Sequence, residues 1–137
     1  MTKIPTWTYQ NKPLDTIPDE YEGFVYLITN TTTGQKYIGK KLAKFKTTKP
    51  PLKGKKNKRR GKKESDWKDY YGSHTEIKNI IIEEGTDVFN REILHICFNK
   101  KQLTYYENKY LFSLGVIESN DYYNDNIEGR YFSKDLL

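Results

Sequence analysis

The fold is decided by residues 23–39, which read GFVYLITNTTTGQKYIG. An apolar run is followed by a polar turn that ends in Gly34 and by a second run, and this pattern predicts a β-hairpin at about residues 23–40. The hairpin can bring two phenols, Tyr26 and Tyr37, to one side of a small sheet. Tyrosine favours strands, so core packing is the default interpretation of both rings. The rest of the chain decides whether they also have a chemical role.

Outside the hairpin, hydrophobic spacing predicts two helices and a third strand. A capping-box sequence begins at Ser73 and precedes isoleucines at helical spacing, and Gly85 suits the end of that helix. Residues 88–98 read as a strand, and residues 99–114 read as a second helix. We therefore expect a small α/β (α+β) domain whose short, mostly antiparallel three-stranded sheet is flanked by helices.

The expected organisation is one domain with appendages at both ends. A chain of 137 residues is long enough for one domain with a real core and short for two. The prolines near the N-terminus and the weak periodicity there predict an irregular arm. The predicted divisions are an arm at residues 1–22, a domain at residues 23–132 with a basic insertion at residues 41–66, and a tail at residues 133–137. Prolines and glycines among the lysines of the insertion predict a long basic loop or arm.

Charge is distributed very unevenly. Residues 40–68 hold fourteen Lys and Arg against Glu64 and Asp66, a net +12, whereas the remainder holds ten against sixteen, a net −6. This polarity predicts a polyanionic partner, and nucleic acid is the obvious candidate. A solvated linker and a localisation signal are alternative interpretations of the basic run. The predicted nucleic-acid contacts are its cations: Lys44, Lys46, Lys53, Lys55, Lys56, Lys58, Arg59, Arg60, Lys62, Lys63 and Lys68.

Composition argues against several other classes of protein. The sequence has no apolar stretch of the ~18 residues that a membrane span needs, and its start does not resemble a signal peptide. The single cysteine, Cys97, forms no internal disulfide and suits a reducing cytoplasm. His95 and Cys97 lack partners at zinc-ligand spacing, so we interpret both as structural. We expect a cytoplasmic protein that does not bind membranes.

Glu107 lies on the apolar stripe of the second predicted helix, which Leu103, Leu111 and Leu114 define. A carboxylate on a core-facing stripe is costly unless it is paired, protonated or bound to a metal. Glu107 therefore either lies at the edge of the stripe, where it reaches solvent or a lysine, or acts as a metal ligand or acid–base group.

These residues resemble a known family. Val25-Tyr26, followed eleven residues later by Tyr37-Ile38-Gly39, is similar to the signature of the GIY-YIG endonucleases, although Phe24 stands where the family has its first glycine. Glu107 falls where that family places its metal-binding glutamate, and Asn124 resembles its downstream asparagine. The resemblance covers about residues 23–126 apart from the basic insertion. Small phage-encoded members have a similar Lys-Gly-Lys-Lys segment, which implies a phage origin and a host-cytoplasmic location.

The resemblance implies metal-dependent hydrolysis of a DNA phosphodiester. Glu107 would hold Mg²⁺, or Mn²⁺ in its place, and Tyr26 would accept a proton from the attacking water or orient it, while Tyr37 would position water or phosphate. A free phenol has a pKa of about 10, and we expect neighbouring cations to favour the phenolate. The lysines that flank the second motif are the candidates: Lys36, Lys40 and Lys41.

One departure from the family concerns its catalytic arginine. The family usually has an arginine on a helix eight residues beyond the motif glycine, where this chain has Thr47 in a lysine-rich segment. The resemblance therefore assigns its role to another cation, and the candidates are Lys41, Lys44, Lys46, Arg59, Arg60 and Lys68. His74 lies near the zone where some relatives carry a catalytic histidine, although a helix-start role is the simpler interpretation.

Two alternative functions remain open at the level of sequence. One is a non-catalytic protein that binds nucleic acid through the basic arm, and the other is an RNA-directed nuclease. The chain has no room for a separate DNA-binding domain of the kind that homing nucleases append. Recognition would therefore come from the arm, the termini, a partner or a possible homodimer.

Overall fold

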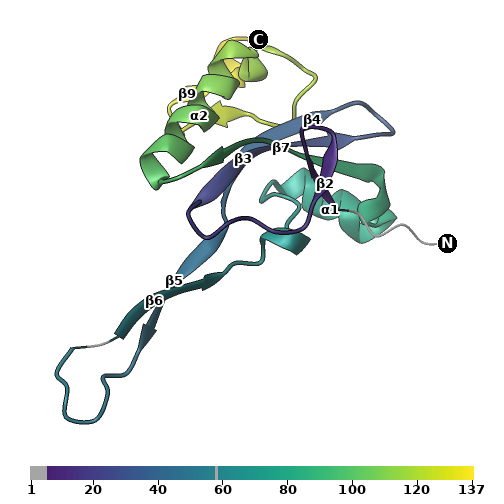
Figure 1. Ribbon diagram of the computed structural model, residues 1–137. Helices are drawn as coiled ribbons and strands as arrows, with labels where there is room; N and C mark the ends of the chain where they lie inside the picture. The colour runs from purple at the N-terminus through teal and green to yellow at the C-terminus, as the bar shows by residue number, and fades with distance from the viewer. Residues whose placement is uncertain (1–5, 58) are drawn as a thin grey trace.

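The computed structural model describes residues 6–57 and 59–137, with one mixed five-stranded sheet at the centre (Figure 1). Lys58, one of the predicted nucleic-acid contacts, lies outside the described residues, and Arg59 and Arg60 are described as backbone alone. The strand order is β2-β1-β7-β3-β4, and every neighbouring pair is antiparallel except β1 and β7. The strands are β1 (Trp7–Tyr9), β2 (Lys12–Leu14), β3 (Gly23–Asn30), β4 (Lys36–Leu42) and β7 (Phe89–Cys97).

The predicted hairpin and third strand form the middle and one edge of this sheet. In the β3–β4 register, Tyr26 lies opposite Gly39, and Ile28 lies opposite Tyr37. Side chains alternate between faces and cross-strand partners share a face, so both phenols lie on the same face, two positions apart. On the other side of β3, the β7 register shifts between Val25 and Tyr26, which marks a bulge.

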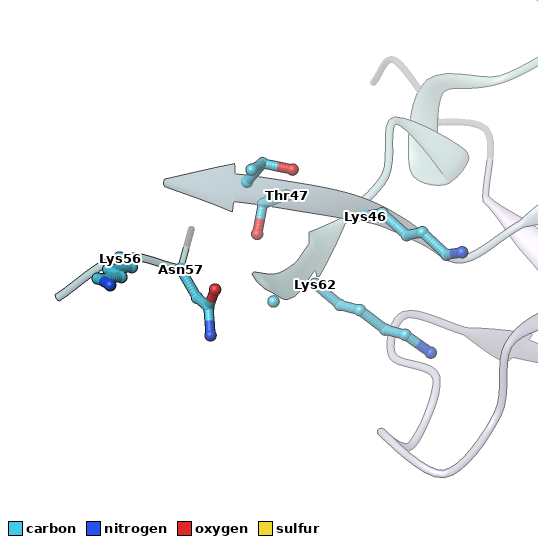
Figure 2. A pocket seen from close by; sticks show the side chains of 7 residues that line it. Lys46, Thr47, Lys56, Asn57 and Lys62 are labelled. Atoms are coloured by element: carbon cyan, nitrogen blue, oxygen red, sulfur yellow. The ribbon is translucent and has the colours of Figure 1, made fainter. Parts of the chain in front are cut away.

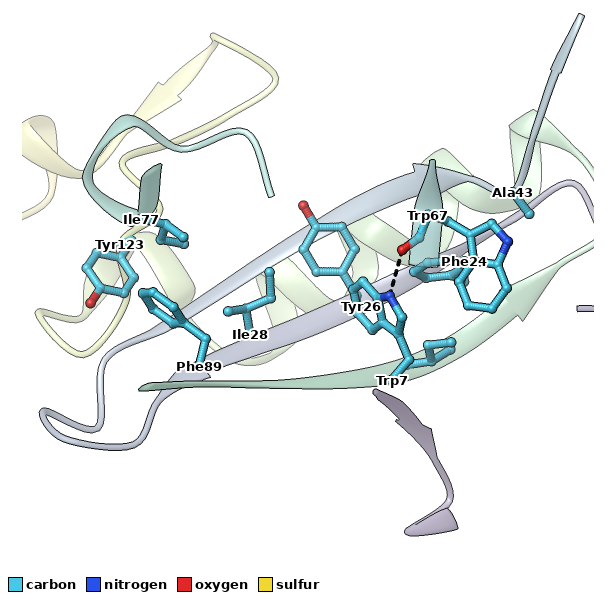
Figure 3. Close-up of a cluster of buried hydrophobic side chains, with 10 residues drawn as sticks. Trp7, Phe24, Tyr26, Ile28, Ala43, Trp67, Ile77, Phe89 and Tyr123 are labelled. Atoms are coloured by element: carbon cyan, nitrogen blue, oxygen red, sulfur yellow. Dashed lines mark hydrogen bonds between the residues drawn. The ribbon is translucent and has the colours of Figure 1, made fainter. Parts of the chain in front are cut away.

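One helix covers each face of the sheet. Helix α1 (Thr75–Glu84) packs on the face of Phe24, Tyr26 and Ile28, where the core also contains both tryptophans (Figure 3). Helix α2 (Lys100–Ser113) packs on the opposite face. The predicted capping box is displaced by one residue, because the N-cap of α1 is His74 rather than Ser73. The imidazole Nδ1 of His74 accepts the backbone N–H of Glu76 at 3.2 Å.

The prediction of an irregular N-terminal arm is wrong for residues 7–14. Strand β1 pairs parallel to β7, and β2 pairs with β1 as the outer edge. Trp7 is 1% exposed, and its indole Nε1 donates to the carbonyl oxygen of Trp67 at 2.7 Å. Burial of this one side chain attaches the segment to the sheet. Pro13 is compatible with the outer strand, where proline is tolerated. The sheet therefore has two more strands than the three predicted.

The basic insertion is also more ordered than predicted. Strands β5 (Lys44–Lys49) and β6 (Arg59–Glu64) pair antiparallel as a separate two-stranded hairpin, which projects away from the body of the domain (Figure 1). Of the residues that suggested a loop, Pro50, Pro51 and Gly54 lie in the connection between the two strands, whereas Gly61 lies inside β6. The prediction of a basic loop holds for this connection alone.

The C-terminal segment runs back along β4. Lys36 bridges Tyr122 in parallel, the Tyr123 N–H donates to the Lys36 carbonyl at 2.6 Å, and a short hairpin of β8 (Asn126–Ile127) and β9 (Tyr131–Phe132) follows. The remaining elements are 3₁₀ turns: η1 (Trp67–Asp69), η2 (Thr86–Val88), η3 (Val116–Glu118) and η4 (Ser133–Asp135). Across residues 6–57 and 59–137, the structure contains no helix long and apolar enough to cross a bilayer.

Candidate active site

A hollow of about 380 Å³ lies beside β4 and collects most of the predicted catalytic residues. Strand β4 contributes Tyr37, the start of α1 contributes His74, α2 contributes Glu107, and the C-terminal segment contributes Asn124. The hollow thus combines a phenol, an imidazole and a carboxylate from three separate elements. Functional groups gathered in one concavity are the expected form of a catalytic site.

Tyr26 lies behind this hollow, inside the core. It is 1% exposed and lies beside Trp7 (Figure 3), with the two ring centroids 5.5 Å apart. Its ring also contacts those of Tyr70 and Tyr37, with centroids 5.9 and 6.2 Å away. Burial raises the pKa of its phenol well above 10, and Tyr70, Tyr37 and Glu107 raise it further. The expectation that neighbouring lysines lower this pKa is therefore wrong. Aromatic groups surround the Tyr26 ring, and the carboxylate that affects the pKa of its phenol is that of Glu107, which raises it.

Gly39 is required by the packing of the two phenols. A Cβ at this position would lie against the Tyr26 hydroxyl, 2.6 Å from Tyr26 Cζ and 3.1 Å from Tyr37 Cε2. Ordinary carbon–carbon contacts are about 3.5–4.0 Å. Because Gly39 has no side chain, β4 leaves space there for the hydroxyl of Tyr26, which lies directly opposite on β3.

Tyr37 and His74 stand together at the mouth of the hollow. Their ring centroids are 5.5 Å apart, and the His74 ring also packs 5.9 Å from that of Tyr123. Burial raises the pKa of the Tyr37 phenol, although a hydrogen bond with Ser73 opposes this effect. Since His74 Nδ1 accepts the helix N–H, the neutral imidazole carries its proton on Nε2. This tautomer makes His74 a hydrogen-bond donor toward a ligand.

Glu107 is half-buried, and burial raises the pKa of its carboxyl group. Lys40 opposes this rise, Glu128 adds to it, and the Lys40 ammonium donates to Thr104 Oγ1 on the same helix at 2.9 Å. In the part of the chain that the structure describes, there is no cluster of three or more His, Cys, Asp or Glu that could hold a metal ion. A cation at Glu107 would therefore take most of its ligands from water and substrate.

Asn124 binds the backbone of β4 with both ends of its amide. Its Oδ1 accepts the Ile38 N–H at 3.0 Å, and its Nδ2 donates to the Ile38 carbonyl at 2.8 Å. Ile38 is the residue between the two motif positions Tyr37 and Gly39. The predicted catalytic asparagine therefore lies in the hollow and holds the strand that carries the motif.

Lys41 is the predicted cation that contacts Tyr70, an aromatic neighbour of Tyr26. Its ammonium lies 4.2 Å from the centroid of the Tyr70 ring and 2.6 Å from Asp66 Oδ1, and the Tyr70 ring packs 5.9 Å from that of Tyr26. Thr47, where the family has its arginine, lies in β5 rather than on a helix. The structure therefore contains no arginine at that point in the fold.

Among the described residues, none of the predicted cations, Lys41 included, lines the candidate catalytic hollow. At the base of the hairpin, Lys44 and Lys62 pair with Asp19 and Glu22, and the Lys68 ammonium lies 3.6 Å from Glu64. A larger hollow of about 1000 Å³ lies on the hairpin itself (Figure 2) and includes Lys46, Lys56 and Lys62. Lys53, Lys55 and Lys63 are exposed. We place the active site in the smaller hollow because the larger one contains no acidic or imidazole group.

Sequence reasoning missed Arg91 as a supporting residue of the site. Its guanidinium is buried, stacks 4.0 Å from the Tyr71 ring centroid, and donates through Nη1 to the carbonyls of Lys68 and Tyr70 at 2.8 and 2.9 Å. It thereby fixes the segment that places Tyr70 against Tyr26. One signal was available, because Arg91 occupies an inward position between Phe89 and Ile93 in the alternation of β7.

Comparison with known proteins identifies the family of the chain. The family model described as "Putative endonuclease segE, GIY-YIG domain" matches residues 7–127, which include β1 and the basic hairpin. Searches of curated proteins and of solved structures gave no match. The matched region covers most of the chain, and it contains the paired tyrosines, Gly39 and Glu107 in the arrangement described above. The chain belongs to the GIY-YIG endonuclease family.

Proposed function

We propose that this protein is a metal-dependent DNA endonuclease that hydrolyses phosphodiester bonds in the hollow beside β4. The observation that carries the proposal is the convergence of Tyr37, His74 and Glu107 in one hollow, with Tyr26 directly behind them. The three groups come from β4, the N-cap of α1 and the middle of α2. Membership of the family predicts nuclease chemistry, and the hollow contains the residues to which we assign that chemistry.

The residues at Glu107 fit a hard divalent cation. A half-buried carboxylate whose pKa is raised by burial is costly when ionised, and a bound cation would offset that cost. Mg²⁺ commonly binds through one or two carboxylates and keeps several waters and phosphate oxygens as ligands. Mg²⁺, or Mn²⁺ in its place, would polarise the phosphate and stabilise the charge that develops on the leaving oxygen.

The chain's own groups would position the phosphate and the attacking water. Tyr26 is held as a neutral phenol, so we assign it to orienting the water rather than to removing its proton. His74 would donate from Nε2 to a phosphate oxygen, which follows from the tautomer fixed by its N-cap role. Tyr37, close to His74, would add a second hydroxyl contact on the same side.

Lys41 is the best candidate for the role of the absent arginine. Its ammonium lies 4.2 Å from the centroid of the Tyr70 ring, which packs against Tyr26, and its side chain is 12% exposed. A cation in such surroundings stabilises a nearby phosphate more strongly than one in bulk water. Its partner Asp66 is mostly exposed, so the pair would be exchanged readily for a phosphate contact.

The direct test is nicking of supercoiled plasmid DNA in Mg²⁺, with single-stranded and branched DNA assayed in parallel. We expect wild-type protein to cut at least one of these forms and Glu107→Ala to cut none. Glu83→Ala is the matched control, because Glu83 is an exposed helical glutamate on α1 outside the hollow. Failure of the wild type to cut any form with Mg²⁺ or Mn²⁺ would refute the proposal.

Binding of nucleic acid without cleavage is a second candidate, favoured by the lack of a family arginine at Thr47. Under that alternative, the protein would bind DNA with a steep salt dependence and leave it intact in every metal. A single site cuts one strand at a time. If the enzyme makes double-strand breaks, we therefore propose that it does so as a homodimer or by two successive nicks.

A further inference from the structure

We propose that the β5–β6 hairpin is a ribbon that enters the major groove of duplex DNA and thereby selects B-form DNA as the substrate. This inference rests on the proposed function, because it concerns how the same substrate is held. It differs from a general basic patch in naming one groove and one nucleic-acid form.

The shape and exposure of the hairpin suit a groove. Each strand has six residues, which corresponds to a ribbon about 20 Å long at ~3.3 Å per residue. The described side chains along it are exposed, apart from Lys44 and Thr47, which are partly covered. An isolated two-stranded hairpin is only marginally stable in water. The major groove of B-DNA, about 12 Å wide, admits a two-stranded ribbon.

The charges of the ribbon require a polyanion. Residues 44–64 include eleven Lys and Arg and one acid, Glu64. That carboxylate is engaged at the base, where it accepts from Trp67 Nε1 at 3.0 Å and lies near Lys68. Lys46 and Lys62 lie directly opposite one another in the register, and Lys62 pairs with Glu22 at 2.7 Å, whereas Lys46 is exposed. Phosphates on either wall of a groove would supply counter-ions for the exposed cations of the ribbon.

The middle of the ribbon is narrow enough to approach base edges. Thr47 pairs with Gly61, and a Cβ at Gly61 would lie 3.2 Å from Thr47 Oγ1. The pair therefore presents one small hydroxyl side chain and bare backbone, beside Lys46 and Lys62 (Figure 2). Threonine can contact base edges through its hydroxyl or its methyl group, and lysine can contact guanine.

The ribbon is joined through one buried residue to the strand that carries the candidate active site. Ala43, which is buried, is the one residue between β4 and β5. Its N–H donates to the Glu22 carbonyl and its carbonyl accepts the Ser65 N–H, both at 2.9 Å. Tyr37 and Thr47 are ten residues apart, so at ~3.3 Å per residue they are separated by at most about 33 Å, or roughly one turn of DNA. We therefore expect the ribbon to contact the duplex within one helical turn of the cleaved bond, and on only one side of that bond.

The same geometry disfavours RNA. The major groove of A-form RNA is deep and narrow, so a protein ribbon cannot enter it, and a single strand has no groove. A duplex of RNA would therefore leave the ribbon without its main contacts.

The first experiment maps the groove by photocrosslinking. Wild-type protein in EDTA is bound to duplex DNA that contains 5-iododeoxyuridine, whose iodine projects into the major groove, and crosslinked peptides are identified by mass spectrometry. We expect crosslinks within residues 44–64. Crosslinks confined to other segments, or binding without any crosslink, would overturn the proposal. Cleavage is not needed, so an inactive enzyme would still give an interpretable result.

The second experiment removes the ribbon. Residues 46–62 are replaced by Asn-Gly, which keeps the Phe45–Lys63 pair, and circular dichroism checks that the domain remains folded. The replacement deletes nine Lys and Arg. If about half of them contact phosphates, the slope of log K against log salt falls by about 4. Lys12→Ala, on the far edge strand β2, is the control and should leave the slope unchanged.

Binding of 24-base-pair DNA and RNA duplexes is then compared in both proteins. We expect the wild type to prefer DNA at least about tenfold and the shortened variant to lose this preference. Equal binding of both duplexes by the wild type, or an unchanged preference in the variant, would overturn the proposal. Loss of plasmid nicking alone would instead bear on the proposed function.

Discussion

Gly39→Ala tests whether the active site depends on the close fit between β4 and Tyr26. The added methyl group would lie 2.6 Å from Tyr26 Cζ and even closer to the hydroxyl. Since carbon contacts are normally about 3.5–4.0 Å, the phenol has to move by about 1 Å. The rings of Trp7, Phe24 and Tyr70 surround it, so little space exists for that movement.

The expected losses of stability and of cleavage rate follow from these distances. Overpacking of a tight core costs about 1–3 kcal/mol, which corresponds to a fall of roughly 1 M in the urea midpoint. A displacement of about 1 Å in a positioning group can reduce the rate about 10²-fold. Urea unfolding is followed by the fluorescence of Trp7 and Trp67, which lie in the same core. Activity is followed by the conversion of supercoiled to nicked plasmid.

A matched control and a double variant separate the steric effect from a general effect of replacing a strand glycine. In Gly61→Ala, on the exposed ribbon, the added methyl group lies near one side-chain atom, Thr47 Oγ1. We therefore expect the free energy of unfolding to change by no more than about 0.5 kcal/mol. In Gly39→Ala with Tyr26→Phe, part of the stability should return because the closest contact is the hydroxyl, while nicking stays absent. Wild-type stability and nicking in Gly39→Ala would refute the reasoning.

Three further predictions concern the residues around the hollow. Asn124→Ala leaves both backbone groups of Ile38 without this partner, so we expect the free energy of unfolding, measured in urea, to fall by about 1–3 kcal/mol. An unchanged urea midpoint would contradict this prediction. Burial raises the pKa of Glu107, so its ionised form destabilises the metal-free fold above that pKa. Glu107→Gln should therefore raise the melting temperature at pH 7, the gain should fade as pH falls through the raised pKa toward 4.5, and Mg²⁺ should stabilise the wild type alone. Arg91→Met removes the donor to two carbonyls and should lower the free energy of unfolding by about 2–4 kcal/mol. Arg91→Lys should fail to restore this stability, because an ammonium lacks the planar fork of the guanidinium.

Local signals in the sequence were sufficient for the hairpin and both helices. Strands β3 and β4 have apolar runs around a turn, and α1 and α2 have helical spacing between residues that cap them. Strands β1 and β2 have three residues each and no usable periodicity. Their place is set by the burial of Trp7 against distant segments, which no local pattern reports.

The charged hairpin and the environment of Tyr26 were missed for different reasons. Apart from Phe45 and Gly61, β5 and β6 consist of charged residues and threonines, so the hydrophobic pattern that identifies strands is absent. The identity of the catalytic candidates followed from spacing, but their electrostatics did not. Lys40 and Lys41 flank the second motif in sequence, yet the strand directs them to Thr104 and Asp66, whereas aromatic rings enclose Tyr26.

The chemistry and the proposed DNA contact both depend on the register of one strand. A slip of β4 by one residue against β3 would turn Tyr37 to the opposite face and would also rotate the ribbon that continues from it. Asn30 fixes the turn by accepting the N–H groups of Thr32 and Thr33, and Asn124 fixes the strand by holding Ile38 from the other side. Neither asparagine belongs to the paired-tyrosine motif. The motif supplies the candidate reacting groups, and they come together because residues outside the motif hold β4 in one register.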